Sequence, residues 1–183
     1  EESFYELCKF YDGKIESLAD VKGIAYREAG EVIVKPFELV KDLSTLKFAY
    51  EDFKDFEHKI IYYESSRGCP FSCAFCLSSA THGVRAKSAE QALADLAAFE
   101  ELDGRFTVKL VDRTFNFDRA RAKAIWRALS EPCFTKHYHF EVCASLLNEE
   151  SFEILSRFPK GKIQLEFGLQ STNPETLLAS SRH

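Results

Sequence analysis

The chain has 183 residues, of which 45% are apolar and 29% charged, and this composition supports a packed core and excludes intrinsic disorder. Its 24 Lys and Arg against 29 Asp and Glu give a net charge of −5, which excludes the basic surface of a general nucleic-acid binder. No apolar run reaches the roughly 18 residues that span a bilayer, and no signal-peptide pattern opens the chain.

The N-terminal third predicts small elements ahead of the main fold. Residues 4–10 have the apolar spacing of an amphipathic helix. Residues 23–27 and 31–35 flank a short turn and predict a β-hairpin. Residues 36–59 contain an acidic and aromatic run and predict a connector that lies on a surface.

From residue 60 onward, predicted strands alternate with predicted helices. Short β-branched or aromatic runs, bounded by Gly, Pro, Asn or Asp, indicate four strands at residues 60–66, 106–111, 138–143 and 162–167. Helix start signals follow each strand, at Ser88 (a capping box with Gln91), Asp118, Asn148 and Asn173-Pro174. This β-α alternation predicts an α/β fold with a parallel sheet and crossover helices.

Three of the six cysteines lie within eight residues, just after the first predicted strand. Cys69, Cys73 and Cys76 form a C-x3-C-x2-C pattern on a segment predicted to be a loop. A secreted disulfide framework spreads its cysteines through a shorter chain. The cluster therefore indicates metal binding in a reducing compartment, and we expect a cytoplasmic protein.

Two kinds of metal centre suit three clustered thiolates, which are soft ligands. A structural zinc site needs four ligands, and His82 extends the pattern to C-x3-C-x2-C-x5-H. An iron–sulfur cubane held by three cysteines leaves one iron open for a substrate or cofactor. The position after a parallel strand, where α/β folds place their sites, favours the cluster. The alternatives are a non-catalytic metal-binding module that uses Cys69, Cys73, Cys76 and His82, and three thiols without metal.

The cysteine loop, with Phe75 just before its last cysteine, resembles the signature of the radical S-adenosylmethionine (SAM) superfamily. Residues 63–73 resemble the subgroup that has an N-terminal cobalamin-binding domain, and residues 110–116 and 166–171 agree with it. The resemblance implies a partial parallel (β/α) barrel of four βα units. Three segments follow from it: residues 1–35 as the end of a cobalamin-binding-like domain, 36–59 as a linker, and 60–183 as the first half of a radical SAM core.

The resemblance also implies the chemistry. Cys69, Cys73 and Cys76 would ligate a 4Fe–4S cluster, SAM would chelate the open iron, and an electron from the cluster would cleave SAM to methionine and a 5′-deoxyadenosyl radical. The other implied site residues are Phe75 against the adenine, Asp112, Thr114 and Phe115 facing the methionine moiety, and Glu166, Gln170 and Ser171 facing the ribose or the substrate, with Glu166 as the candidate catalytic residue.

The expected function is thus reductive cleavage of SAM to start radical chemistry on a small-molecule substrate, with cobalamin-dependent methyl transfer as one candidate reaction. A flavodoxin or ferredoxin would supply the electron. The chain departs from the family in two ways, because full barrels have six or more βα units and because the Asp-x-His-x-x-Gly motif of cobalamin binding is absent. The first residue is Glu1 and the chain contains no Met, so we expect it to be part of a longer protein whose later strands are needed for efficient SAM turnover.

Some of these residues also admit structural roles. Glu141 and Glu166 either contact SAM or substrate, or form salt bridges with Lys109 or Lys162 on the helix-facing side of the sheet. Asp112 either closes the site or caps the next helix. The three scattered cysteines are expected to be buried small apolar residues; they are Cys8, Cys133 and Cys143.

Overall fold

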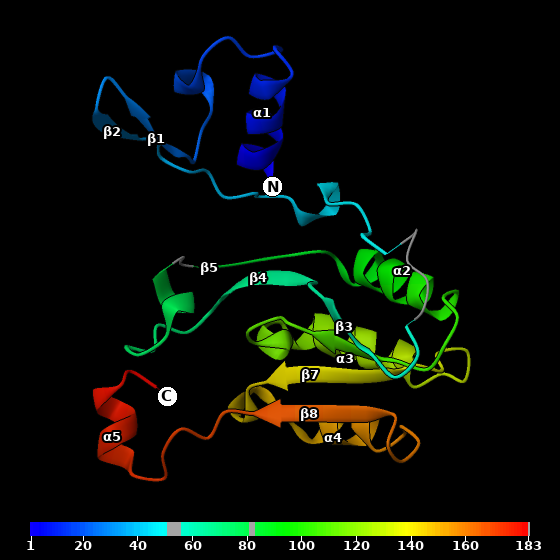
Figure 1. Cartoon of the computed structure of the whole chain (residues 1–183). Coiled ribbons are helices and arrows are strands. Elements are labelled where there is room, and N and C mark those ends of the chain that lie inside the picture. Colours follow the sequence, from blue (N-terminus) through cyan, green and yellow to red (C-terminus); the bar gives the residue numbers. More distant parts are fainter. Residues whose placement is uncertain (51–55, 81–82, 183) are drawn as a thin grey trace. The chain divides into compact units, whose positions relative to one another are not determined.

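The chain divides between Lys41 and Asp42 into two units in the computed structural model (Figure 1). The structure describes residues 1–50, 56–80 and 83–182. No helix among these residues is long and apolar enough to cross a membrane.

The first unit confirms the predicted helix and hairpin. Helix α1 spans Glu2–Tyr11, and strands β1 (Ala25–Glu28) and β2 (Glu31–Val34) pair antiparallel. Ala29 and Gly30 at the turn have positive φ, of 50° and 87°, the geometry of a tight two-residue hairpin turn. Between α1 and β1 lies the 3-10 helix η1, Leu18–Asp20. The predicted connector contains the 3-10 helix η2, Leu43–Thr45, and its residues 51–55 lie outside the described residues.

A parallel sheet forms the centre of the second unit and confirms the predicted α/β class. Its four strands are β3 (Ile60–Tyr63), β6 (Thr107–Leu110), β7 (His137–Val142) and β8 (Ile163–Phe167). They lie side by side in chain order, all parallel, and β7 and β8 point the same way in Figure 1. Over the described residues this sheet is open, with β3 and β8 at its two edges.

Each strand of the sheet is followed by a helix that begins at a predicted start signal. The helices are α2 (Ala89–Glu100), α3 (Arg119–Leu129), α4 (Glu149–Leu155) and α5 (Pro174–Ala179). Short 3-10 helices precede α3 and α4, namely η4 (Phe115–Phe117) and η5 (Ala144–Leu146). Each start signal satisfies backbone N–H groups that a helix leaves free at its N-terminus. Asp118, for example, accepts hydrogen bonds from the N–H groups of Ala120 and Arg121 at 2.9 and 3.0 Å.

The two faces of the sheet differ because successive side chains of a strand point to opposite sides. Val108 and Leu110 of β6 are fully buried in a core that also contains Leu96 of α2, Trp126 of α3 and Ile154 of α4. Helices α2, α3 and α4 therefore cover this face. The alternate positions carry polar side chains, among them Lys109, His139, Glu141 and Glu166. This second face, the open face of the sheet, is polar and partly exposed.

The cysteine segment belongs to a hairpin that the sequence pattern did not predict. The first predicted strand, residues 60–66, ends at Tyr63 in the sheet, and Ser66 begins a separate strand, β4 (Ser66–Cys69), which pairs antiparallel with β5 (Gly83–Ala86). Between them lies the 3-10 helix η3, Leu77–Ala80. A Cβ on Gly68, whose φ is +96°, would lie 2.1 Å from the carbonyl oxygen of Gly83. Glycine is therefore required where the two strands meet, and Cys69 is held at the end of β4.

Candidate functional site

The three clustered cysteines line one cavity of about 260 Å³ in the second unit. Cys69 ends strand β4, and Cys73 and Cys76 follow in the connection to β5. Cys73 is buried and the other two are half-buried. Among the described residues, no three His, Cys, Asp or Glu side chains already stand in the arrangement that holds a metal ion. The three thiols nevertheless fit an iron–sulfur cluster, because thiolates are its usual ligands and because all three line the same cavity. They would converge when they bind it.

Four of the other predicted site residues line the same cavity. Phe75 comes from the cysteine loop, Thr114 follows β6, and Glu166 and Gln170 come from β8 and the segment after it. The carboxyl ends of parallel strands gather at one edge of a sheet, which is where α/β folds bind ligands. Segments up to 101 residues apart in sequence thus meet at this edge, from Cys69 to Gln170.

The chain after β8 turns sharply beside the cavity. Gln170 has a φ of +64°, which is uncommon for a residue other than glycine. A Cβ on Gly168 would lie 2.8 Å from Nε2 of the Gln170 side chain. The turn continues to Ser171, whose hydroxyl accepts a hydrogen bond from the N–H of Asn173 at 3.0 Å. Gln170 therefore lines the cavity, while Ser171 stabilises the entry to α5 and does not line it.

Two further predicted cofactor contacts, Asp112 and Phe115, lie outside the cavity wall. Phe115 is fully buried, with its ring centroid 4.5 Å from that of Phe140 and 5.6 Å from that of Trp126. Asp112 is also fully buried. Neither side chain lines the thiol cavity, and the predicted contact of each with the cofactor stays a prediction.

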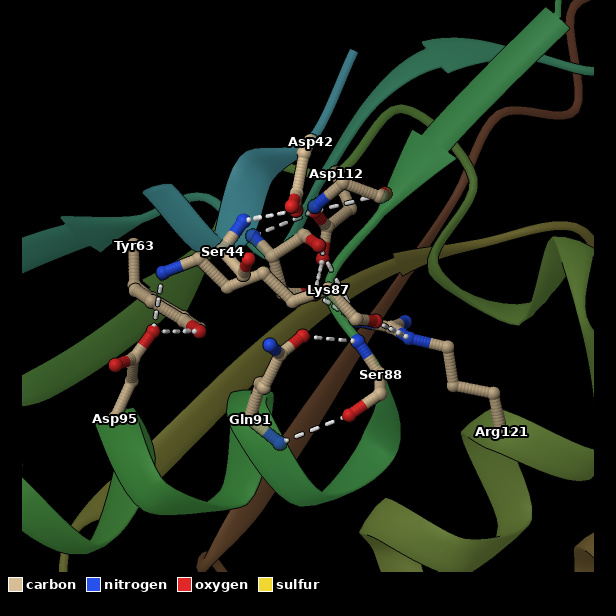
Figure 2. A network of polar contacts seen from close by, with 11 residues as sticks. Asp42, Ser44, Tyr63, Lys87, Ser88, Gln91, Asp95, Asp112 and Arg121 are labelled. Carbon is tan, nitrogen blue, oxygen red and sulfur yellow. Dashed lines mark hydrogen bonds and ion pairs between the residues drawn. The ribbon is translucent and has the colours of Figure 1, made fainter. Parts of the chain in front are cut away.

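Asp112 joins the end of β6 to the start of the cysteine hairpin (Figure 2). Its Oδ1 accepts hydrogen bonds from the N–H of Ser65 at 2.9 Å, from the N–H of Ser66 and from the Ser66 hydroxyl at 2.9 Å, and its Oδ2 accepts one from the Ser65 hydroxyl at 2.6 Å. Burial raises the pKa of Asp112, against the opposite effect of these hydrogen bonds and of Arg121. The alternative that Asp112 caps the next helix is wrong, because Asp118 does so.

Arg121 on α3 extends this network to the other strand of the hairpin. Its Nη2 donates to the Ser65 hydroxyl at 2.8 Å, and its Nε donates to the carbonyl of Lys87, just after β5, at 2.8 Å. The N–H of Lys87 in turn donates to the carbonyl of Ser65 at 3.0 Å. Burial lowers the pKa of Arg121, against the opposite effect of Asp112. Both ends of the hairpin are thus attached to the sheet and to α3.

Lys87 and Tyr63 share a carboxylate on α2 in the same region (Figure 2). Lys87 Nζ lies 2.5 Å from Oδ2 of Asp95, and the Tyr63 hydroxyl donates to the same oxygen at 2.7 Å. Burial, with this hydrogen bond, raises the pKa of Tyr63. The polar contacts around the hairpin therefore reach α2 as well as α3.

Charged side chains form a cluster on the open face of the sheet. Lys109 Nζ lies 3.0 Å from Glu166 and 3.7 Å from Glu141, and His139 Nε2 lies 3.0 Å from Glu166. The hydrogen bond from Lys109 lowers the pKa of Glu166 and raises that of Lys109. The predicted salt bridge between Glu166 and Lys109 therefore exists, but on the open face, and Glu166 lines the cavity as well. Lys162, the other predicted partner, donates to the carbonyl of Glu131.

The cavity contains residues that the sequence did not single out. Arg113 lines it, and so does Arg182, whose Nη1 lies 4.0 Å from Cys73 Sγ. Cys143 lines it too, so the expectation that this cysteine is simply buried is wrong, and Cys8 and Cys133 are exposed. The available signal was position, since Arg113 follows the predicted strand 106–111 and Cys143 is the last residue of the predicted strand 138–143. His82 lies outside the described residues.

A second cavity of about 360 Å³ adjoins the first. Ser78, Arg113 and Glu141 line both. The second cavity also contains Tyr62 and Lys109, so it extends over the open face of the sheet. The two cavities are therefore neighbours along the edge where the strands end.

The fold and the three clustered cysteines define an α/β protein with a cavity that thiols line. The family model described as the radical SAM superfamily matches residues 63–183, and the chain belongs to this superfamily.

Two of the individual proteins that the chain is similar to are a curated protein and a solved structure. An uncharacterised methyltransferase of Pyrococcus horikoshii, PH0819, is 24% identical over 173 residues, which cover 90% of this chain and 37% of the relative. The apo structure of the cobalamin-dependent SAM radical enzyme OxsB superposes with a TM-score of 0.73 at 20% identity, over 100% of this chain and 28% of OxsB. The chain thus spans about a third of the length of these proteins, and the likeness to OxsB shows the fold.

Proposed function

We propose that this protein binds a 4Fe–4S cluster through Cys69, Cys73 and Cys76 and cleaves SAM reductively to begin radical chemistry on a small molecule. The observation that carries the proposal is that all three thiols line one cavity, which Phe75 and Gln170 also line. When bound, the cluster supplies one electron to SAM, which breaks into methionine and a 5′-deoxyadenosyl radical. The protein positions the cofactors and excludes water from them.

The cavity wall offers suitable groups for each part of SAM. Phe75 is 56% exposed, so its ring has a free face for the adenine. Arg113 has no hydrogen-bond or ion-pair partner for its side chain within the described part of the chain. Its guanidinium therefore suits the carboxylate of the methionine moiety.

Glu166 acts in this proposal as a hydrogen-bond acceptor. Because Lys109 holds the pKa of Glu166 below its usual range, its side chain is a carboxylate at neutral pH. A carboxylate accepts hydrogen bonds from ribose hydroxyls or from an ammonium group, and it has no proton to give. Glu166 is therefore assigned to binding SAM or substrate.

The second cavity is the proposed place of the substrate. It adjoins the thiol cavity through Arg113 and Glu141, so a substrate there lies next to the group that would form the radical. Its wall is polar and charged, which suits a polar small molecule.

Cobalamin-dependent methyl transfer is the proposed reaction. Support comes from the name of the Pyrococcus horikoshii relative and from the fold shared with OxsB. The segment 1–35 is assigned to a cobalamin-binding-like domain, and the Asp-x-His-x-x-Gly motif is absent from the chain, so cobalamin would be held by other sequence. We also propose a cytoplasmic location and electron supply by a flavodoxin or ferredoxin.

Anaerobic reconstitution with iron and sulfide tests the cluster. The wild-type protein is expected to turn brown and to hold iron and sulfide, whereas Cys73→Ala loses most of both, because the remaining two thiols cannot hold the cubane. Cys133→Ala, at an exposed cysteine outside the cavity, is the matched control and keeps wild-type iron. Purified protein that binds zinc in place of iron, with Cys73→Ala and His82→Ala both losing it, would instead establish the non-catalytic module of Cys69, Cys73, Cys76 and His82.

A further inference from the structure

The segment after β6 contacts strand β4 at both of its ends. Asp112 binds Ser65 and Ser66, where β4 begins. Two residues later, Thr114 Oγ1 lies 3.5 Å from Sγ of Cys69, where β4 ends. Thr114 is buried and lines the thiol cavity.

The buried network around Asp112 fixes this contact in place. Asp112 is fully buried and accepts hydrogen bonds from both serines, and Nη2 of Arg121 donates to the Ser65 hydroxyl at 2.8 Å. Because β4 is only four residues long, a strand fixed at Ser66 has little freedom at Cys69. The distance between Thr114 and Cys69 is therefore set by the fold.

The proton on the Thr114 hydroxyl has two acceptors within reach. In this structure the Thr114 hydroxyl donates to the backbone carbonyl of Arg113 at 2.8 Å. The Cys69 thiol is then the donor in its contact with Thr114 Oγ1. A cysteine that ligates iron is a thiolate and has no proton to donate. The contact then persists only if the Thr114 hydroxyl turns and donates to the sulfur.

We propose that Thr114 donates a hydrogen bond to the Cys69 sulfur of the assembled cluster and raises the reduction potential of that cluster. Hydrogen bonds to the sulfurs of a cluster are among the features that set its potential. A donor stabilises the reduced state more than the oxidised state, because the reduced cluster carries one more negative charge. Thr114 is thus a tuning residue that acts through Cys69. The inference rests on the proposed cluster ligation by Cys69.

A redox titration of the reconstituted protein tests the proposal, with the reduced cluster followed by electron paramagnetic resonance as it takes up one electron from the titrant. Thr114→Val keeps the shape of the side chain and removes the hydroxyl. At the wild-type midpoint, its reduced-to-oxidised ratio is expected to fall about tenfold, which corresponds to a downward shift of about 59 mV for one electron. Thr114→Ser keeps the hydroxyl and restores the wild-type potential.

Thr107→Val is the matched control, since Thr107 lies at the other end of β6 and outside the cavity; its potential stays at the wild-type value. Equal midpoints for wild type and Thr114→Val at equal iron content overturn the inference, and so does an equal shift in Thr114→Ser. If Thr114→Val does not fold or load, Thr114→Ala in the same titration replaces it, and an unshifted Thr114→Ala overturns the inference. A wild-type protein that forms no cluster would overturn the proposed function itself, a result that the iron content alone reveals.

Discussion

At the scale of single residues, Asp112 carries a buried carboxylate that four hydrogen bonds from two serines hold in place. Asp112→Asn keeps one acceptor oxygen, but it places an NH2 group against a hydroxyl donor and removes the charge that faces Arg121. We expect the free energy of unfolding to fall by about 3 kcal/mol, as when one partner of a buried polar network is lost.

Urea denaturation of the Asp112→Asn protein measures this loss. Asp103→Asn is the control, because Asp103 is an exposed loop residue, and surface changes of this kind stay within about 0.5 kcal/mol. If Asp112→Asn were as stable as this control, the network would contribute nothing to the fold.

The three clustered cysteines and Phe75, which line the cavity, were predicted from a local signal. The cysteine spacing and Phe75 lie within a few positions of one another, so one segment carries the whole pattern. Asp112 was placed at the cofactor because it ends a strand, whereas its partners Ser65 and Ser66 lie 47 and 46 residues earlier. A contact at that separation leaves no periodic mark in the sequence.

At the scale of elements, the helix starts were predictable because capping is local chemistry between a side chain and the N–H groups two or three residues later. The hairpin of β4 and β5 was not predictable in this way. Each strand has four residues, and together they carry two glycines, two arginines and a cysteine, so neither shows the alternation typical of a strand. Its pairing depends on the close approach of Gly68 to Gly83.

This hairpin supplies a prediction with an internal control. Both Gly68 and Gly83 have positive φ, of 96° and 82°, but only Gly68 has a backbone atom where a Cβ would lie. Gly83→Ala is expected to lose about 1 kcal/mol of unfolding free energy from left-handed strain alone. In Gly68→Ala the new Cβ would also push the two strands apart, so this variant is expected to lose more unfolding free energy than Gly83→Ala.

Because Cys69 ends the strand that contains Gly68, the Gly68→Ala protein is also expected to hold less iron after reconstitution than Gly83→Ala. Urea denaturation and iron analysis of the two variants check both statements. Equal stability and equal iron content in the two proteins would show that the close approach of the strands does not position Cys69.

At the scale of the whole molecule, the parallel sheet was predictable because strands that alternate with helices need crossover connections. The side chains that share the cavities were not predictable, since they come from the ends of different strands. Arg113, Cys143 and Arg182 meet the cysteine loop there only in three dimensions. The sequence therefore predicted the edge where the site lies and left out about half of its wall.

The central proposal also concerns the whole molecule: with a cluster bound in the thiol cavity, the protein cleaves SAM. The direct measurement incubates the complete reconstituted protein anaerobically with SAM and dithionite and quantifies 5′-deoxyadenosine and methionine by mass spectrometry. We predict that both products form in equal amounts with wild type and Cys133→Ala, and that neither rises above background with Cys73→Ala. A wild-type protein that carries a full complement of iron and sulfide and yields no 5′-deoxyadenosine would contradict the account.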